Sequence, residues 1–382
     1  MRRVYLDYNA TALTRPEALA AAEAAARGAF GNPSSPHRAG AAARDVLERA
    51  REEVAALAGT SPARIVFTAS ATEANNTVLA DALARATPGR DRVVVAATEH
   101  PSILEPCERL RARGLALTVL PVEPDGRLDP ARFAASLDAR VLLASVQWAN
   151  NETGVLQPVA ELAALARERG VPFHTDAAQA FGRVPVGLDA LGCDFASLAS
   201  HKLGGPKGIG ALYCAVESAQ PLLVGGPQEH GRRAGTENVP AAAGFGAACV
   251  ATGRALAAES ARLGALRDRL EAAIRAKIPD VTVHGAAAPR LPQTLSVGFA
   301  EANGEALLWA LDLAGISVSL GAACASGSLE PSPVLRALGV SPALARASLR
   351  FSLGHATRED EIAHVCDVLL VLVERVRAES RA

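Results

Sequence analysis

One lysine stands where a predicted buried strand meets a glycine-rich loop. The segment SLASHKLGGPKGIGALY begins at Ser197, so Lys202 follows an apolar run that ends at Ala199. Lysine side chains lie mostly in solvent. A desolvated lysine amine can instead act as a nucleophile and form a Schiff base with a carbonyl compound. The position of Lys202 therefore indicates amine chemistry.

Polar side chains also follow the other predicted strands. The residues at these strand ends are Thr72, His100, Asn151, Asp176 with Gln179, and Lys202. A single strand-end carboxylate often caps the next helix, and a single histidine is usually structural. Reactive side chains at five successive strand ends are instead typical of one shared site.

These residue types match what pyridoxal phosphate requires of a protein. The cofactor needs a lysine, and it needs a carboxylate beside its pyridine nitrogen so that the ring can accept electrons. Lys202 and Asp176 supply these two groups. A helix N-terminus suits the phosphate, because its free N–H groups and its dipole favour an anion, and the Ala71–Thr72 turn offers one. His100 supplies a flat face for the ring.

The elements that must position these residues alternate along the chain. Helices are predicted over Arg38–Ala58, Glu73–Arg85, Ser102–Arg113 and Val159–Arg169. Short strands are predicted over Ile65–Phe67, Val93–Ala96, Ala116–Leu120, Val141–Val146 and Phe173–Thr175. Such alternation predicts an α/β fold with a mainly parallel sheet covered on both faces, which binds ligands at the carboxyl ends of its strands.

The last third of the chain predicts a smaller α+β domain. A long alanine-rich helix over Val239–Lys277 precedes it. Strands are then expected over Gln293–Phe299 and Leu349–Ser352, with a helix at Glu305–Leu313 and a final helix at Arg358–Arg377.

Composition and charge argue against several classes of protein. The 382 residues are 49% hydrophobic, and 39 basic against 40 acidic side chains give a net charge of −1. No basic run stands out, which argues against nucleic acid or a membrane surface as a partner. The start, MRRVYLDYNAT, lacks a signal-peptide stretch, and no transmembrane span is predicted. The six cysteines form no C-x-x-C pair, so we expect no metal site and a reducing cytoplasm.

Ten motifs together make the chain resemble a known family. They are YLDYNAT, GNPSSPHRAG, IVFTASATEANN, TEHPSIL, NNETGVLQP, HTDAAQAFG, SHKLGGPKGIGALY, GRRAGTENV, GAACASGSLEPSPVLRALG and LRFSLGHAT. In this order they are similar to the cysteine desulfurases of the NifS/IscS type, which belong to the class-V aminotransferase-like, fold-type I pyridoxal phosphate enzymes. The resemblance covers nearly the whole chain. It implies a large domain with a mainly parallel seven-stranded sheet between helices.

The resemblance also implies roles for individual residues. The cofactor-binding residues would be Ala71, Thr72, His100, Asn151, Asp176, Gln179, Ser200, His201, Lys202 and Thr236. Lys202 would form the Schiff base, and Thr236 would reach the phosphate from a second subunit of a homodimer. The substrate-binding residues would be Asn32, Asn151 and Arg350. The catalytic residues would be Lys202, His100 and Cys324, with Cys324 as the sulfur acceptor.

Two local features bear on these roles. Cys324 lies in SLGAACASGSLEPSP, which is rich in small residues and is expected to form a mobile loop that can carry sulfur into and out of the site. The family usually has serine where this chain has Ala199, with Ser200 one residue later. A one-residue shift on a strand turns a side chain to the opposite face. The sequence therefore does not decide whether Ser200 makes the phosphate contact of the usual serine.

The expected domains are an N-terminal arm over residues 1–12 that packs with the small domain, a large domain over 13–256, and a small domain over 257–382. The expected activity converts L-cysteine to L-alanine and leaves the sulfur as a persulfide on the enzyme. That sulfur would serve iron–sulfur cluster assembly or other thiolation through an acceptor or scaffold protein.

Two other classes of function stay open at this point. The first is a selenocysteine lyase or another class-V aminotransferase-like enzyme. A cysteine in a long loop argues against transamination, which needs no thiol. The second is a sulfur-relay partner protein with weak catalysis, against which Lys202, Asp176 and His100 argue.

Overall fold

A seven-stranded sheet forms the centre of the larger part of the molecule. The computed structural model describes residues 2–216, 219–321 and 331–381. In spatial order the strands are β2 (Ile65–Thr68), β8 (Gly210–Cys214), β7 (Phe195–Ala199), β6 (Phe173–Asp176), β5 (Val141–Ser145), β3 (Arg92–Ala96) and β4 (Ala116–Leu120). Only β8 runs antiparallel to its neighbours β2 and β7. The predicted mainly parallel sheet is confirmed.

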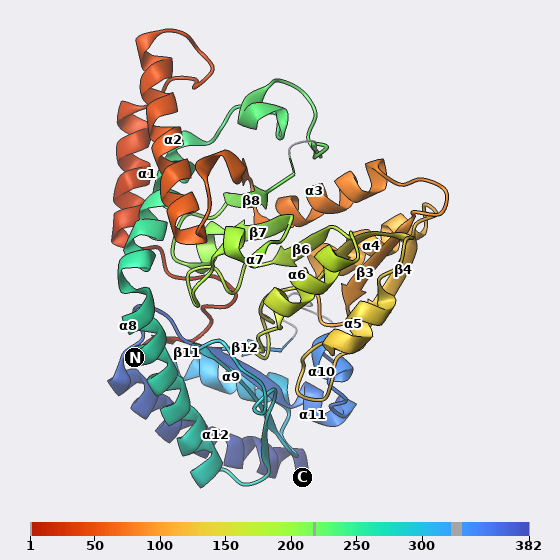
Figure 1. Cartoon of the computed structure of the whole chain (residues 1–382). Helices are drawn as coiled ribbons and strands as arrows, with labels where there is room; N and C mark the ends of the chain where they lie inside the picture. The colour runs from red at the N-terminus through yellow and green to blue at the C-terminus, as the bar shows by residue number, and fades with distance from the viewer. Residues whose placement is uncertain (1, 217–218, 322–330, 382) are drawn as a thin grey trace.

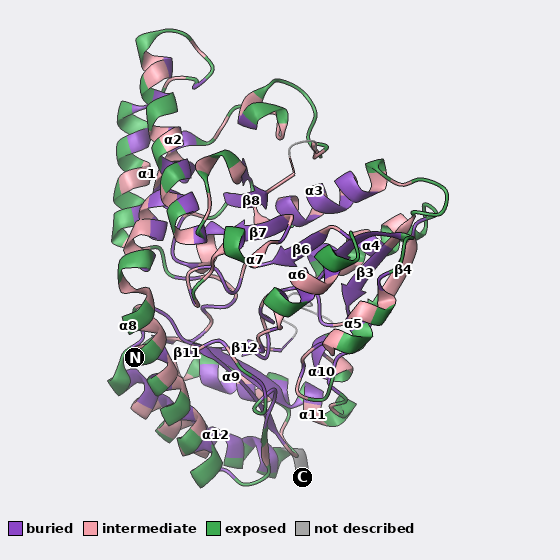
Figure 2. Cartoon of the chain, in the orientation of Figure 1, coloured by how far each residue is buried: buried purple, intermediate pink, exposed green. Residues whose placement is uncertain are grey.

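Helices cover both faces of this sheet (Figure 1). They include α1 (Pro16–Gly28), α2 (Arg38–Ala58), α3 (Ala71–Ala84), α4 (Pro101–Arg111), α5 (Pro130–Ser136), α6 (Val159–Glu168) and α7 (Leu188–Leu191). Successive strand residues point to opposite faces, so Val66 packs in one hydrophobic core and Phe67 in the other. Figure 2 shows the strands buried between these helical layers. This burial on both faces explains the near-continuous apolar strands.

The start of α3 differs from the sequence prediction. The helix begins at Ala71, two residues before the predicted start, because Ser70 caps it. The Ser70 hydroxyl accepts a hydrogen bond from the Glu73 N–H at 3.1 Å, and the Glu73 carboxylate accepts one from the Ala69 N–H at 2.9 Å. This pair resembles a capping box, except that the carboxylate bonds to the N–H one residue before the N-cap, and it fixes the turn that faces the predicted site.

Helix α8 (Val239–Lys277) runs from the large sheet to the smaller part of the molecule (Figure 1). It packs against α1 and α2 at one end and against α12 (Glu359–Arg381) at the other. In length and apolar composition it resembles a membrane span, but half of its most apolar stretch is buried inside the protein. It is a core helix shared by both parts.

A second sheet organises the C-terminal part. Its strands β12 (Ser319–Leu320), β13 (Ser348–Ser352), β10 (Thr294–Phe299) and β9 (Val281–Val283) are antiparallel. Its helices are α9 (Gly304–Leu313), α10 (Pro333–Ala337), α11 (Pro342–Arg346) and α12. This matches the predicted α+β character.

The N-terminal strand β1 (Val4–Tyr5) pairs in parallel with β11 (Ile316–Ser317). The N-terminal segment thus lies against the C-terminal part of the chain. The expected boundary between residues 256 and 257 falls within the continuous helix α8 and stays a prediction.

His174 supports a prediction about acid stability. The side chain is fully buried in β6 between the hydroxyls of Ser145 and Ser197, at 2.8 and 3.0 Å. Burial lowers its pKa to about 4, whereas an unfolded histidine titrates near 6.5. The folded state therefore excludes a proton that the unfolded state binds. Above about pH 6.5 the His174 ring is neutral in both states, so it does not lower the free energy of unfolding. As the pH falls from 6.5 toward 4, the free energy of unfolding decreases by up to about 1.4 kcal/mol per pH unit.

The measurement compares the wild type with His174→Gln. Its expected result is that the free energy of unfolding of the wild type, relative to that of the variant, falls as the pH drops from 7 to 4. Taking the difference removes the contribution of every other titrating group. A difference that stays constant over this range would contradict the assignment.

Candidate active site

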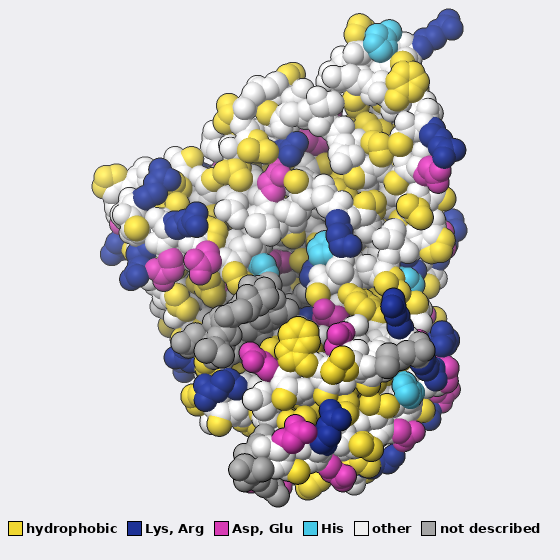
Figure 3. Space-filling view, turned by 180° about the vertical axis from the view of Figure 1, so that it is seen from behind, with side chains coloured by type: hydrophobic (Ala, Val, Ile, Leu, Met, Phe, Trp, Pro, Cys, Tyr) yellow, Lys and Arg dark blue, Asp and Glu magenta, His cyan; other side chains and the backbone are white. Residues whose placement is uncertain are grey.

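A cavity of about 300 Å³ lies at the carboxyl ends of β5, β6 and β7, where the large sheet faces the second one. Its lining residues are Asn9, Ala10, Ser70, Ala71, Thr72, His100, Ser102, Gln147, Ala149, Asn151, Asp176, Ala178, Gln179, Ala199, His201, Lys202 and Arg350. Figure 3 shows the molecule from behind, hollowed between its upper and lower parts, with histidine, basic and acidic side chains around the hollow. The cavity lies where parallel sheets bind ligands.

Asp176 ends strand β6 with its side chain held from both sides. One carboxylate oxygen accepts a hydrogen bond from the Asn75 side-chain amide at 2.8 Å, and the other accepts one from the Ala178 N–H at 3.0 Å. The residue is 7% exposed. The carboxylate is thus fixed at the cavity wall.

His100 caps helix α4 and has a defined proton position. Its Nδ1 accepts a hydrogen bond from the Ser102 N–H at 3.1 Å and lies 2.8 Å from the Ser102 hydroxyl. Because Nδ1 is an acceptor, the proton of the neutral ring sits on Nε2. Burial lowers the pKa of His100, and Lys202 adds to that lowering while Asp176 opposes it. The neutral imidazole is therefore the stable form at neutral pH.

A polar chain connects Asp176 to His100. The Asn75 amide nitrogen lies 2.8 Å from the Asp176 carboxylate and 2.8 Å from the Ser102 hydroxyl. That hydroxyl in turn contacts Nδ1 of His100. The carboxylate and the imidazole are held in one arrangement by these two intermediate side chains.

Lys202 lies in a short 3-10 turn directly after β7. Its amine donates to the backbone carbonyls of Asn9 and Ala10, the latter at 2.9 Å. The Asn9 carbonyl also accepts from the Gln179 side chain at 3.0 Å. The N-terminal segment therefore sets the position of the Lys202 amine and of Gln179.

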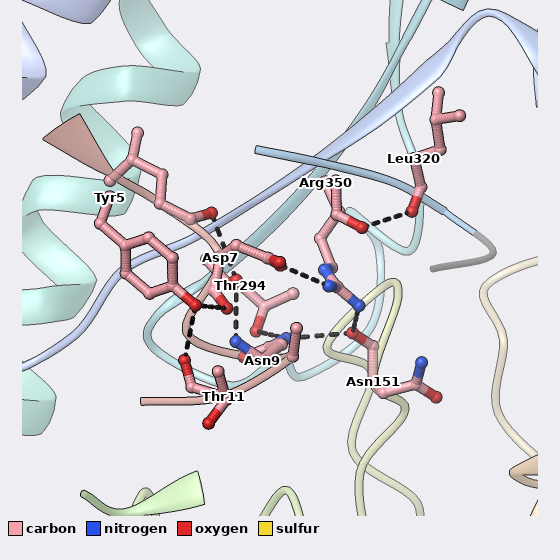
Figure 4. Close-up of polar contacts among 12 residues, drawn as sticks. Tyr5, Asp7, Asn9, Thr11, Asn151, Thr294, Leu320 and Arg350 are labelled. Atoms are coloured by element: carbon pink, nitrogen blue, oxygen red, sulfur yellow. Dashed lines mark hydrogen bonds and ion pairs between the residues drawn. The ribbon is translucent and has the colours of Figure 1, made fainter. Parts of the chain in front are cut away.

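Arg350 enters the same cavity from the second sheet. It lies in β13, is 1% exposed, and pairs with the Asp7 carboxylate at 2.6 Å. It also donates to the Asn151 carbonyl at 3.0 Å, as Figure 4 shows. Its Nε is buried and has no hydrogen-bond partner within the described residues. A buried guanidinium with unused donors suits a bound carboxylate.

One end of the cavity suits a phosphate group. Ala71 and Thr72 form the first turn of α3 and line the cavity together with His201. The backbone of Gly210 passes so close that a Cβ there would lie 2.9 Å from the Ala71 nitrogen. Burial lowers the pKa of His201 to about 4, with Lys202 and Lys207 adding to the effect. The neutral ring can donate a hydrogen bond, and the N–H groups of the helix can bind an anion.

The structure brings most of the predicted site residues together, but three of the described ones do not line the cavity. Ser200 is fully buried beneath the turn, its hydroxyl lies where a Cβ on Gly205 would point, and Ala199 takes the lining position. The one-residue shift thus turns the hydroxyl away, so Ser200 is not placed to bind the phosphate. Asn32 and Thr236 are exposed elsewhere. Cys324 lies outside the residues that the structure describes.

Sequence reasoning missed several residues that build the cavity. Asn9 donates its side-chain amide to the Asn151 carbonyl at 3.0 Å and to the Thr294 hydroxyl at 2.8 Å (Figure 4). Asn75 and Ser102 were also missed. Asn9 lies in the motif YLDYNAT, and this motif was the only available signal.

Comparisons with known proteins agree with this geometry. Residues 4–365 match the family model described as aminotransferase class-V. The chain is 46% identical to a cysteine desulfurase of Cereibacter sphaeroides, over all of this chain and 98% of that protein. It is 41% identical to the cysteine desulfurase IscS of Dictyoglomus turgidum, over 99% of this chain and 96% of that protein.

Solved structures are also similar. A NifS-like protein superposes with a TM-score of 0.91 at 31% identity, over 98% of this chain and all of that chain. A structure described as SspA in complex with cysteine gives a TM-score of 0.81 at 31% identity, over 92% of this chain and 98% of that chain. The chain therefore belongs to the aminotransferase class-V family and, within it, to the cysteine desulfurases.

Proposed function

We propose that the protein removes sulfur from L-cysteine to give L-alanine and transfers that sulfur to its own Cys324. One observation carries the proposal: the Lys202 amine, the Asp176 carboxylate and the buried Arg350 guanidinium line one cavity. These three groups are what an amino-acid substrate and an electron-accepting cofactor require. The similarity to cysteine desulfurases is the reason for proposing L-cysteine as the substrate.

The cavity residues fit pyridoxal phosphate, the cofactor of this family. The carboxylate of Asp176 would pair with the pyridine nitrogen, Gln179 would bond the ring hydroxyl, and His100 would lie against the ring. Ala71, Thr72 and His201 would hold the phosphate. When bound, the cofactor supplies an electron sink for the bonds at the substrate Cα.

The chain's own residues would then bind the substrate and move its protons. Arg350 would hold the substrate carboxylate as a planar fork, with Asn151 beside it. The Lys202 amine would carry the Cα proton, aided by its position against the carbonyls of Asn9 and Ala10. His100 carries its proton on Nε2 in the resting state, so it acts first as a donor through that nitrogen.

Sulfur transfer would use the Cys324 thiolate. Its sulfur would attack the substrate sulfur, so that an S–S bond forms while the substrate C–S bond breaks and alanine leaves. Burial raises the thiol pKa of both Cys107 and Cys193 to about 12. Burial also raises the pKa of Cys249. These thiols remain protonated at neutral pH and are poor nucleophiles.

The direct test supplies the holoenzyme with L-cysteine and a reductant. We expect alanine and sulfide in equal amounts. Formation of pyruvate or of a transaminated product in place of alanine would contradict the proposal and favour an aminotransferase.

The substrate-binding role of Arg350 makes a specific prediction. Arg350→Lys keeps the positive charge but loses the fork, so the KM for L-cysteine is expected to rise by roughly 10- to 100-fold. The matched control is Arg346→Lys, at an exposed arginine in the neighbouring helix α11. Steady-state kinetics of alanine release measure both variants. An unchanged KM in Arg350→Lys would remove Arg350 from the substrate site.

We also propose a homodimer in which Thr236 completes the partner's phosphate site. Two exposed apolar side chains support it: Phe30 is 78% exposed and Val224 is 85% exposed. They belong to the loops between α1 and α2 and between β8 and α8, which stand out at the top of Figure 1. Contact with a partner subunit would remove these two apolar side chains from water. An active, cofactor-loaded monomer in sedimentation would contradict this assembly.

The wider role in the cell is part of the same proposal. The sulfur would supply iron–sulfur cluster assembly or another thiolation through an acceptor protein in a reducing cytoplasm. Five free cysteines among the described residues support such a location. Capture of proteins that remove sulfur from the persulfide form identifies the acceptor, and cell fractionation tests the location.

A further inference from the structure

A second cavity lies behind the turn that carries Lys202. It has a volume of about 20 Å³, enough for one water molecule or one small ion. Arg15, Arg183, Thr252, Glu259 and His355 are among its lining residues. None of them lines the larger cavity described above.

Two guanidinium groups face this small cavity with most of their hydrogen-bond donors unused. Arg183 donates to the Lys202 carbonyl, and Arg15 donates to the Leu203 carbonyl at 2.9 Å. Each guanidinium has five N–H donors. Within the described residues, the bond to the Lys202 carbonyl is the only side-chain hydrogen bond of Arg183, and the bond to the Leu203 carbonyl is the only one of Arg15. Neither forms an ion pair within that part of the chain. Arg183 is only 8% exposed, and it lines this cavity.

The charges around the cavity do not balance. Glu259 is the one carboxylate among the lining residues, and both of its oxygens bind Arg262 at 2.9 Å. Three guanidinium groups therefore face two carboxylates, Glu259 and the more distant Glu17, which also acts on Arg15. Burial lowers the pKa of His355 to about 4, so its ring is neutral at neutral pH. Burial and the neighbouring Arg15 lower the pKa of Arg183 to about 10. A negative charge placed here would oppose the lowering of the pKa of both His355 and Arg183.

A third donor is available at the same place. Thr252 in helix α8 is 3% exposed, and its hydroxyl has no hydrogen-bond partner within the described residues. A buried hydroxyl without a partner is costly. Two arginines and one hydroxyl form a donor set without an acceptor of their own.

We propose that this cavity binds a small monovalent inorganic anion, such as chloride, between Arg15, Arg183 and Thr252. The bound anion links the start of helix α1, the segment at Arg183 and helix α8. Since Arg15 and Arg183 also hold the carbonyls of Leu203 and Lys202, the anion stabilises the turn from which the Lys202 amine projects. The site is separate from the substrate site and makes the holoenzyme sensitive to the kind of salt present.

Bromide identifies the site directly. Crystals of the holoenzyme grown in bromide are expected to show an anomalous scattering peak between Arg15 and Arg183. In solution, replacing gluconate by chloride at constant ionic strength is expected to raise the melting temperature by about 1–2 °C, because a ligand that binds only the folded state stabilises it. Gluconate is too large for a cavity of this volume.

Two variants and one control complete the test. Arg15→Gln is expected to abolish the difference between chloride and gluconate, and Thr252→Val is expected to reduce it by at least half with the fold retained. Arg375→Gln, at an exposed arginine on α12, should keep the full difference. A cavity without bromide, or a chloride effect that persists in Arg15→Gln, would overturn the proposal. Neither readout depends on desulfurase activity.

Discussion

Lys202→Ala is expected to abolish turnover of L-cysteine, with a loss of at least about 10³-fold. The amine that projects from the turn after β7 is the group proposed both to bind the cofactor covalently and to carry the Cα proton. Borohydride, which fixes a cofactor held through a lysine Schiff base, should no longer attach it to the chain. The measurements are alanine release and the mass of the borohydride-treated protein.

The same loop offers a matched control. Lys207 is exposed five residues further on and does not line the cavity. Lys207→Ala should keep covalent cofactor attachment and most of the activity. Turnover by Lys202→Ala at the wild-type rate would refute the cofactor site as a whole, since no other lysine in the described part of the chain lines the cavity.

Cys324→Ala is expected to separate substrate binding from sulfur transfer. Arg350 and Asp176 line the cavity without any help from a thiol, so the variant should load pyridoxal phosphate and bind L-cysteine with little change. Alanine release should fall to the background level, because no group accepts the sulfur. L-selenocysteine is a sharper probe, since selenium leaves more easily, and the variant should keep much of any activity on that substrate.

Cys366→Ala provides the control for this second prediction. Cys366 is partly exposed in α12 and packs against the hydrophobic core of the C-terminal part of the chain. Its removal should leave alanine release from both substrates unchanged. Alanine formation from L-cysteine by Cys324→Ala at the wild-type rate would show that another acceptor, such as free thiol in solution, takes the sulfur.

The sequence predicted the parts of the fold that depend on local pattern. Most strands of the large sheet are short apolar runs, and polar residues follow five of them within a few positions, so Asp176, His100 and Lys202 could be placed near one another. Ser200 shows the limit of such placement. The conformation of the turn after β7 places its hydroxyl beneath Gly205, while Ala199 faces the cavity. This conformation could not be predicted from the sequence.

Long-range contacts were beyond sequence reasoning. Asn9 bonds the Thr294 hydroxyl and Asp7 pairs with Arg350, across 285 and 343 residues of chain. Neither pairing has a local signature, because it depends on how the two sheets approach one another. Asn75 lies in helix α3 and Ser102 in helix α4, and nothing in the local sequence distinguishes them from other polar helix residues. Their role appears only when the two helices pack side by side.

The position of the N-terminal segment also has a consequence for synthesis of the chain. Asn9 and Ala10 supply the carbonyls that hold the Lys202 amine, while the backbone N–H of Asn9 donates to the hydroxyl of Ser352 at 2.9 Å. Asn9 therefore emerges from the ribosome more than 300 residues before its partner, a wait of roughly 20 to 70 s at 5–20 residues per second. A chain that ends before Ser352 lacks this contact to Asn9. The surroundings of the Lys202 amine are therefore complete only after β13, the last strand, has been synthesised.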